Sequence, residues 1–330
     1  MRRGKISENV LKRSVLKKIN THRREVINGA GVGTDCAVLS FGEGYDIVLS
    51  TNPVTAPIED IGVYAIHTAL NNIAASGAEP VGIMLSILLP ERTEESELQQ
   101  MMGKAQDICR GCNTEIVGGH TEVIPNVDES IMTVTGVGKR DTALSSLLPG
   151  VRADQDIVIS KWIGLGGTIR LARERREELC TRYPVRMIEE AAAYDKYLSV
   201  IPEAATAMKS GVCGMHDVSG GGIFGALWEL AQRAGVGLEI DLKKIPVKQE
   251  TIEICEFFEV NPYELLSGGC LIMTAEDGDA LVLALERENI PAVVVGRTTE
   301  GNDRVIFNED EKRYLDRPKT DQIYYVKEKL

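Results

Sequence analysis

Four glycine-rich or polar segments hold the residues that could do chemistry in this chain. They are GAGVGTDCAVL (29–39), STNPVTAP (50–57), VGGHTEV (117–123) and GMHDVSGGGIFGAL (214–227). In the last segment glycines precede a helical pattern, and the free N–H groups of a helix's first turn can bind an anion. His120 and His216 stand near glycines. This placement indicates close backbone approach around a ligand, with tight turns and locally satisfied imidazoles as the alternative.

Two common nucleotide-binding motifs are absent from the sequence. The glycines at 29, 31 and 33 precede a strand pattern rather than a helix, so they do not form the dinucleotide-binding fingerprint. No GxxxxGK[ST] segment occurs, which excludes the P-loop. Cys109 and Cys112 form one CxxC, but no second pair or spaced histidine follows to complete a zinc site. We interpret these thiols as structural, with a redox pair as the alternative.

The composition is that of a globular protein with few aromatic residues. The chain has 330 residues, of which 43% are apolar, enough for a sizeable core in one or two domains. The net charge of −12 lacks the basic footprint of a nucleic-acid-binding protein. The seven irregularly spaced cysteines do not form a disulfide framework, and neither a signal peptide nor a membrane span is indicated. We therefore expect a cytoplasmic protein without nucleic-acid or membrane partners.

Helical and strand patterns group the segments into two units. In the first unit, strands are predicted over 36–40, 46–50, 81–89, 114–117 and 130–138, and helices over 7–20, 60–76 and 93–111. This mixture predicts an α+β unit whose sheet is covered on one face. After a linker over 141–156, strands are predicted over 156–160, 237–242, 270–275 and 292–296, with helical patterns between them. The alternation predicts a second, α/β unit.

The segments GVGTDCAVL, STNPVT, ALNNIAASGAEP, IVGGHTEV and MHDVSGGG occur in an order and at separations that resemble the aminoimidazole ribonucleotide (AIR) synthase superfamily, also called the PurM superfamily. The resemblance covers residues 5–310 and is closest to the HypE-like and AIR synthase-related proteins. It implies a PurM-type α+β domain over residues 1–150, whose sheet pairs with that of a second copy into a dimeric β-barrel. It also implies an α/β C-terminal domain over 151–310, and we interpret 311–330 as a polar tail.

The resemblance further implies ATP as cofactor, with Mg²⁺ held by aspartates against the phosphates. Thr34 departs from the acidic pattern of the first segment, and Asp35 is retained. Asn52, Asn72 and His120 stand where the superfamily pattern has further acids, and Asn71 matches the Asn that usually precedes the third acid. Because neutral ligands attract a dication less strongly, we expect Asp35, Asn52 and Asn72 to form a weakened metal site.

The predicted cofactor-binding residues come from all the segments: Gly31, Gly33, Thr34, Asp35, Asn52, Asn72, Gly118, Gly119, Gly220, Gly221 and Gly222. The catalytic candidates are His120, His216 and Asp217. One hypothesis is ATP-dependent phosphoryl-transfer, ligase-like or dehydratase-like chemistry on an unknown small molecule, or action as a maturation factor with a protein partner. The alternative is a catalytically weakened homodimeric scaffold that binds nucleotide or another anion.

The C-terminal sequence departs from HypE itself. The resemblance implies a terminal cysteine that accepts a carbamoyl group, whereas this sequence ends YYVKEKL and has no cysteine after Cys270. The carbamoyl-acceptor step is therefore not expected.

Overall fold

The computed structural model describes residues 8–10, 12, 16, 26–28, 31–34, 36–40, 42, 44–144 and 150–328. Its contacts divide the chain into two compact units. Residues 21–30 and 34–145 form the N-terminal unit. Residues 1–20, 31–33 and 146–330 form the C-terminal unit. The contacts therefore assign two N-terminal stretches to the C-terminal unit, and the predicted division at residues 150 and 310 stays a prediction.

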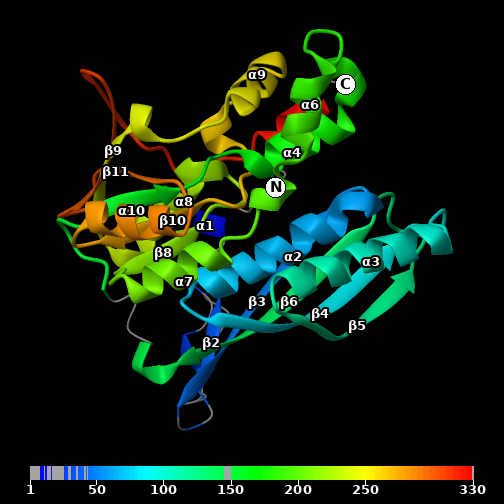
Figure 1. Cartoon of the computed structure of the whole chain (residues 1–330), viewed down its shortest axis with the longest axis horizontal. Helices are drawn as coiled ribbons and strands as arrows, with labels where there is room; N and C mark the ends of the chain where they lie inside the picture. Colours follow the sequence, from blue (N-terminus) through cyan, green and yellow to red (C-terminus); the bar gives the residue numbers. More distant parts are fainter. Residues whose placement is uncertain are drawn as a thin grey trace. The chain divides into compact units, whose positions relative to one another are not determined.

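The N-terminal unit is a six-stranded sheet with helices α2 and α3 on one face (Figure 1). Its strand order is β1-β2-β3-β6-β4-β5, and among the described strands of this sheet only β4 and β5 pair in parallel. The elements are β1 (Val26–Asn28), β2 (Ala37–Ser40), β3 (Tyr45–Thr55), α2 (Ile58–Ala75), β4 (Glu79–Leu89), α3 (Glu95–Gly111), β5 (Glu115–Val123), β6 (Ile131–Asp141) and the 3₁₀ turn η3 (Thr142–Leu144).

Alternating burial along the strands shows why the helices cover one face only. On β4, Ile83 and Leu85 are buried, whereas Met84 between them is 49% exposed. Side chains of neighbouring strand residues point to opposite faces, so the buried set faces α2 and α3. Helix α2 is apolar around most of its circumference and supplies fully buried residues such as Leu70 and Ile73 to this core. Helix α3 begins with a capping box between Glu94 and Glu97.

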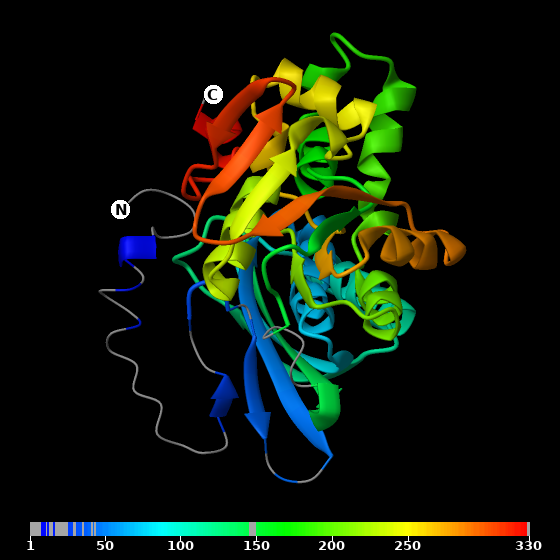
Figure 2. The same ribbon diagram turned by 90° about the vertical axis from the view of Figure 1, so that its left-hand side faces the viewer.

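The C-terminal unit contains a seven-stranded sheet in the order β13-β12-β9-β11-β7-β10-β8. Figure 2 shows β9 beside the β12–β13 hairpin, and β9 and β12 pair in parallel. The strands are β7 (Asp156–Ser160), β8 (Gly214–Asp217), β9 (Gly237–Asp241), β10 (Leu271–Ala275), β11 (Ala292–Thr299), β12 (Arg304–Asn308) and β13 (Glu311–Tyr314). The helices are α1 (Glu8–Val10), α4 (Leu165–Glu174), α5 (Arg176–Leu179), α6 (Val185–Ala192), α7 (Ile201–Lys209), α8 (Gly222–Ala234), α9 (Gln249–Phe257), α10 (Gly278–Arg287) and α11 (Ile323–Glu328), with 3₁₀ turns η4 (Tyr194–Tyr197), η5 (Leu242–Lys244) and η6 (Pro262–Glu264).

One hydrophobic cluster of the C-terminal unit lies between its sheet and α8. Ile159 on β7, Ile240 on β9 and Ile272 on β10 pack with Leu227 and Leu230 of α8. The apolar face of α8 thus fixes the helix on the sheet, and with it the glycine-rich loop that precedes the helix. No helix in the described part of the chain is long and apolar enough to span a bilayer.

Three segments differ from the sequence-based expectation. The predicted turns at 50–57 and 117–123 lie largely inside β3 and β5, so both strands run further than predicted. The stretch 311–330, interpreted as a polar tail, contains β13 and α11, and Ile323 and Val326 of α11 are buried. Of the predicted helix over 7–20, only Glu8–Val10 is described as α-helix, and most of the rest lies outside the described residues.

Candidate functional site

Asn52 and Asn72 meet at the hydroxyl group of Ser50. The Nδ2 atom of Asn72 donates to Ser50 Oγ at 2.9 Å, and Nδ2 of Asn52 donates to the same oxygen at 3.3 Å. Ser50 and Asn52 share the covered face of β3 because they are two residues apart on the strand. Helix α2, which packs on that face, buries Asn72. The structure therefore brings together two predicted site residues that are 20 positions apart in the sequence.

This cluster, formed by Ser50, Asn52 and Asn72, is electrically neutral. Asp35, the carboxylate predicted beside it, lies outside the described residues, and the thiol of the following Cys36 donates to the backbone carbonyl of Asn72 at 3.2 Å. In the described part of the chain, no group of three His, Cys, Asp or Glu side chains could hold a metal ion. Because Mg²⁺ favours charged oxygen ligands, the described residues do not fit a magnesium site.

His120 lies away from this cluster in the structure of one chain. Asn52 is in register with Val134 on β6, Val134 with Leu85 on β4, and Leu85 with Gly119 on β5. Leu85 faces the helices, and its partner Gly119 lies on the same face. His120 follows Gly119 on β5, so it belongs to the opposite face of the sheet. Its side chain is 70% exposed, and its Nε2 lies 3.4 Å from Oε2 of Glu122. The predicted association of His120 with Asn52 and Asn72 is not seen within a single chain.

Gly118 and Gly119 occupy a distorted part of the exposed edge strand β5. The register between β4 and β5 shifts after Ile83, so Val117 is an extra residue on β5. A β-carbon on Gly119 would lie 2.1 Å from the carbonyl oxygen of Leu85, and its φ is +155°. Gly119 therefore has a backbone role that any side chain would disturb. Its predicted role in binding a cofactor stays a prediction.

The first segment approaches α8, the helix that the fourth segment begins. A β-carbon on Gly33 would lie 2.8 Å from the carbonyl oxygen of Glu229 on α8. Gly33 also has a left-handed φ of +68°, and its carbonyl accepts a bond from Arg233 at 3.1 Å. This close approach needs a residue without a side chain. Gly31 belongs to the same stretch, whereas Thr34 belongs to the N-terminal unit.

His216 and Asp217 are buried at the end of β8. The Nδ1 atom of His216 donates to the carbonyl of Asp217 at 2.8 Å, which fixes the tautomer when the ring is neutral. Its Nε2 atom lies 3.6 Å from Oε2 of Glu229. His216 thus contacts Glu229 on α8, the residue whose carbonyl oxygen lies next to Gly33. His216 and Asp217 are almost fully buried, with exposed fractions of 6% and 4%.

The start of α4 and two glycine-containing loops are hydrogen-bonded to one another near the N-terminus of α8. The N–H groups of Gly166 and Gly167 donate to the carbonyls of Ser267 and Leu266 at 2.6 and 2.7 Å. The N–H of Ser267 donates in turn to the carbonyl of Ser219 at 3.2 Å. These bonds hold the Ser219–Gly222 loop, which contains the predicted anion-binding residues Gly220, Gly221 and Gly222.

The N–H of Gly221 donates to the carboxylate of Asp321 at 2.6 Å. An acidic group of the chain itself therefore occupies one of the donors that we expected to bind an external anion. Sequence reasoning missed Asp321 because it lies 100 residues away, in the stretch interpreted as a tail. The glycines of the 266–269 loop were a visible signal of close backbone approach, whereas nothing near Asp321 in the sequence indicated its partner.

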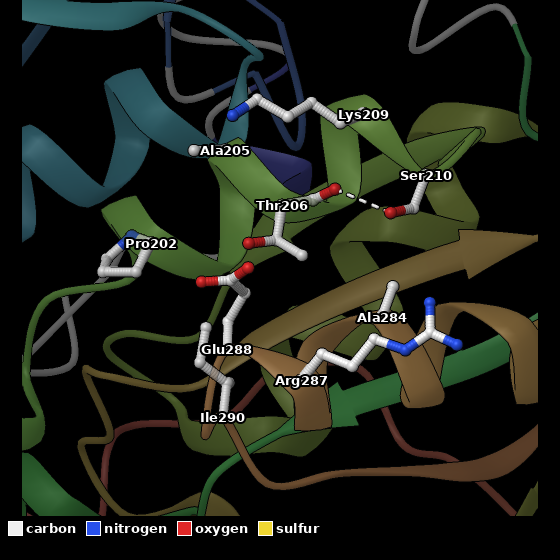
Figure 3. Close-up of a pocket in the computed structure, with 9 residues that line it drawn as sticks. All are labelled: Pro202, Ala205, Thr206, Lys209, Ser210, Ala284, Arg287, Glu288 and Ile290. Carbon is white, nitrogen blue, oxygen red and sulfur yellow. Dashed lines mark hydrogen bonds between the residues drawn. The ribbon is translucent and has the colours of Figure 1, made fainter.

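A surface groove of about 480 Å³ lies between α7 and α10, as Figure 3 shows. Lys209 and Arg287 lie at its margins, and Ser210 donates to the carbonyl of Thr206 at 2.9 Å. None of the predicted site residues lines this groove. The groove is therefore not part of the predicted site.

The sequence matches two domain families that occur together. Residues 33–139 match the family described as AIR synthase related protein, N-terminal domain. Residues 152–308 match AIR synthase related protein, C-terminal domain. The chain belongs to the AIR synthase-related family. The family predicted from the ordered segments is therefore confirmed, and so is the architecture of two domains.

Similar proteins of this family carry names connected with hydrogenase maturation. A putative hydrogenase expression/formation protein of Methanocaldococcus jannaschii is 26% identical over 97% of this chain and 96% of its own length. Carbamoyl dehydratase HypE of Cupriavidus necator is 28% identical over 77% of this chain and 72% of its own.

Solved structures show the same fold. The hydrogenase maturation protein HypE in complex with ATP has a TM-score of 0.68 and 18% identity, covering 97% of both chains. A chain of a HypE–HypF complex has a TM-score of 0.71 and 21% identity, covering 85% of this chain and 93% of its own. At these identities the likeness concerns the fold. Pairing of two sheets into a dimeric barrel is not shown by the structure of a single chain.

Proposed function

We propose that this protein is a HypE-like, nucleotide-binding member of the AIR synthase-related family that acts in the maturation of another protein. The observation that carries the proposal is the match of both family domains, at full-length similarity to a hydrogenase formation protein. The fold it shares with HypE bound to ATP supports ATP as the ligand. The HypE–HypF complex supports a maturation protein as a partner.

The chemistry proposed is ATP-dependent phosphoryl transfer, or a ligase-like or dehydratase-like reaction that uses ATP. Asp35, the Gly118–Gly119 pair and the Gly220–Gly222 loop are the proposed nucleotide-binding positions. His120, His216 and Asp217 are proposed to orient or activate the substrate.

A second candidate function is binding without efficient turnover. Ser50, Asn52 and Asn72 form a cluster without charge, where the family pattern puts carboxylates. A unit charge pair at 4 Å contributes about 4 kcal/mol at an effective dielectric of about 20, before hydration is counted. Loss of two carboxylates should therefore weaken Mg²⁺ binding strongly. The protein would then be a scaffold that holds a nucleotide or another anion.

We further propose that two copies pair through the uncovered face of the N-terminal sheet. Tyr45, Ile47 and Met84 are 61%, 37% and 49% exposed, and each alternates with buried residues that face the helices. Exposed apolar side chains on an uncovered sheet face indicate an interface. A second copy offers the same apolar strands, so two sheets would cover each other as a barrel.

Calorimetric titration with ATP, with and without Mg²⁺, followed by an assay for ADP, tests the function. Metal-dependent binding with ADP release supports the enzyme. Binding without a metal requirement and without ADP supports the scaffold. If ATP binds under neither condition, the proposed nucleotide site is wrong.

A further inference from the structure

The side chain of Lys248 lies among three aromatic rings of the C-terminal unit. Its ammonium group is 3.7 Å from the centre of the Trp162 ring. The centres of the Tyr194 and Tyr197 rings are 5.8 and 5.9 Å from the same nitrogen. We name Trp162, Tyr194 and Tyr197 the aromatic cage. All four residues belong to one compact unit, and none of them is a predicted site residue.

The rings of the aromatic cage are held by bonds that do not involve Lys248. Tyr197 packs edge-on against Trp162, with ring centres 5.3 Å apart. The ammonium group of Lys161, the residue before Trp162, donates to the backbone carbonyl of Tyr197 at 2.8 Å. The hydroxyl group of Tyr194, whose residue is 6% exposed, donates to the carboxylate of Glu250. The aromatic cage is therefore built independently of the cation that it contains.

The ammonium group of Lys248 makes no hydrogen bond or ion pair with any residue that the structure describes. Glu250, the nearest acid in the sequence, accepts the bond from Tyr194 instead. An unmodified lysine has three N–H donors and is strongly hydrated, so ring faces alone do not match it. Methylation keeps the positive charge and removes N–H donors. Aromatic cages are suited to methylated ammonium groups for this reason.

The spacing of the rings leaves room for methyl groups. The ammonium group already contacts Trp162, whereas the centres of the two tyrosine rings lie about 2 Å further away. A methyl carbon extends about 1.5 Å from its nitrogen. Methyl groups directed at Tyr194 and Tyr197 would therefore lie about 4.3 Å from those ring centres, near the contact distance of carbon atoms.

We propose that Lys248 is a site of N-methylation, and that the aromatic cage holds its di- or trimethylammonium group. The methyl donor is a sulfonium compound supplied by a separate methyltransferase. The neutral amine attacks the methyl carbon, the carbon–sulfur bond breaks, and its electron pair stays on sulfur as a thioether. The nitrogen releases a proton to solvent before each further methylation. Lys248 is half-buried, so its side chain can leave the cage to react.

Methylation would fix the start of α9, where Lys248 is the N-cap residue, against η4 and the segment that follows β7. This proposal does not depend on nucleotide binding or on a metal.

Mass spectrometry of the protein purified from the cells that make it tests the modification. We expect the peptide that contains Lys248 to carry two or three added methyl groups. Lys196 is the internal control, because it is exposed and its ammonium group faces only the Tyr197 ring, at 5.0 Å. Its peptide should be unmodified. Fewer than two methyl groups on Lys248, or equal methylation of Lys196 and Lys248, would refute the proposal.

Nuclear magnetic resonance tests whether the aromatic cage holds the methylated group in the full chain. Reductive methylation with isotope-labelled formaldehyde converts lysines into dimethyl-lysines. We expect the methyl signal of Lys248 to lie upfield of the signal of Lys196, because the faces of aromatic rings shield nearby nuclei. Lys248→Arg removes this signal and so assigns it. Trp162→Leu should shift the signal of Lys248 toward that of Lys196.

A Lys248 signal at the position of exposed lysines in the wild type would show that the aromatic cage does not hold the methylated group, and would overturn the proposal. The wild-type measurement decides the question even if Trp162→Leu folds poorly.

Discussion

The carboxylate of Asp46 and the guanidinium group of Arg140 lie 3.1 Å apart on the covered face of the N-terminal sheet. Their side chains are 4% and 6% exposed. Arg140 also donates to the backbone carbonyl of Ser76, at the C-terminal end of α2. This ion pair therefore joins β3, β6 and the end of the helix that carries Asn72.

Asp46→Ala should destabilise the protein strongly, because it leaves the charge of Arg140 buried without its partner. We expect a loss of about 3–5 kcal/mol in the free energy of unfolding. Urea denaturation followed by circular dichroism measures it. Glu79→Ala is the control, since Glu79 forms an exposed pair with Lys139 at 3.1 Å. That change should cost less than about 1 kcal/mol, and equal losses would contradict the role of the buried pair.

Gly119→Ala should disturb the pairing of β4 with β5, because a β-carbon there would lie 2.1 Å from the carbonyl oxygen of Leu85. We expect a loss of about 1–3 kcal/mol in unfolding free energy. Gly118→Ala is the control, since its nearest neighbour would be Met84 Cε at 3.9 Å, an ordinary contact. Thermal unfolding of both variants gives the comparison. A tolerated Gly119→Ala would show that β5 can shift its register.

Changing Asn52 and Asn72 to Asp should restore charge to the cluster at Ser50. We expect Mg·ATP to bind at least about tenfold more tightly than to the wild type. Without Mg²⁺, the double variant should unfold at a lower temperature because two carboxylates lie close together in a buried site. Calorimetry and thermal unfolding, with and without Mg²⁺, measure both effects.

Asn113 and Asn126, which are exposed, provide the control for added charge. Their change to Asp should leave Mg·ATP affinity unaltered. If the Asn52 and Asn72 double variant gains no affinity for Mg·ATP, those two residues lie outside the nucleotide site.

Cys109 of the CxxC pair should be poorly reactive in the folded protein. Burial and the neighbouring Cys112 raise the pKa of the Cys109 thiol to about 11. A raised pKa means less thiolate, so at pH 8 only about one part in a thousand is ionised. Iodoacetamide at pH 8, followed by peptide mass spectrometry, should label the exposed Cys180 and leave Cys109 unlabelled until urea is added. Rapid labelling of Cys109 would revive the redox alternative.

Lysine on the uncovered face of the sheet should prevent dimer formation. Ile47→Lys combined with Met84→Lys places two charges where we propose that a second copy packs. Light scattering of the wild type should give about twice the chain mass of 36.1 kDa, and the variant should give the monomer mass. Leu283→Lys is the control, because Leu283 is 54% exposed on α10 of the other unit. A monomeric wild type would contradict the proposed barrel.

The sequence predicted most of the elements with a clear apolar period. The helix expected over 60–76 is α2 (Ile58–Ala75), and the strand expected over 81–89 is β4 (Glu79–Leu89). Strand β5 was predicted too short because Gly118 and Gly119 indicated a turn, whereas the parallel pairing with β4 continues through them. Helix α7 was missed, although Pro202 lies in its first turn, where proline is tolerated.

The candidate site was predictable only in part. The identity and order of the segments were sufficient to indicate the family and to point to Asn52 and Asn72. Three features depend on strand register and on long-range packing. They are the shared contact of Asn52 and Asn72 with Ser50, the position of His120 on the other face of the sheet, and the bond from Gly221 to Asp321. A local pattern does not contain this information, because it is set by residues from distant parts of the chain.

The assignment of residues 31–33 to the C-terminal unit means that the polypeptide passes between the two units more than once. A gene fragment beginning at residue 146 would omit Glu8, which accepts a bond from Trp228 at 3.3 Å, and Gly33, which contacts Glu229. The side of α8 that Glu8 and Gly33 contact would then be exposed to solvent. We therefore expect residues 146–330, expressed alone, to be less stable than the same unit in the full chain.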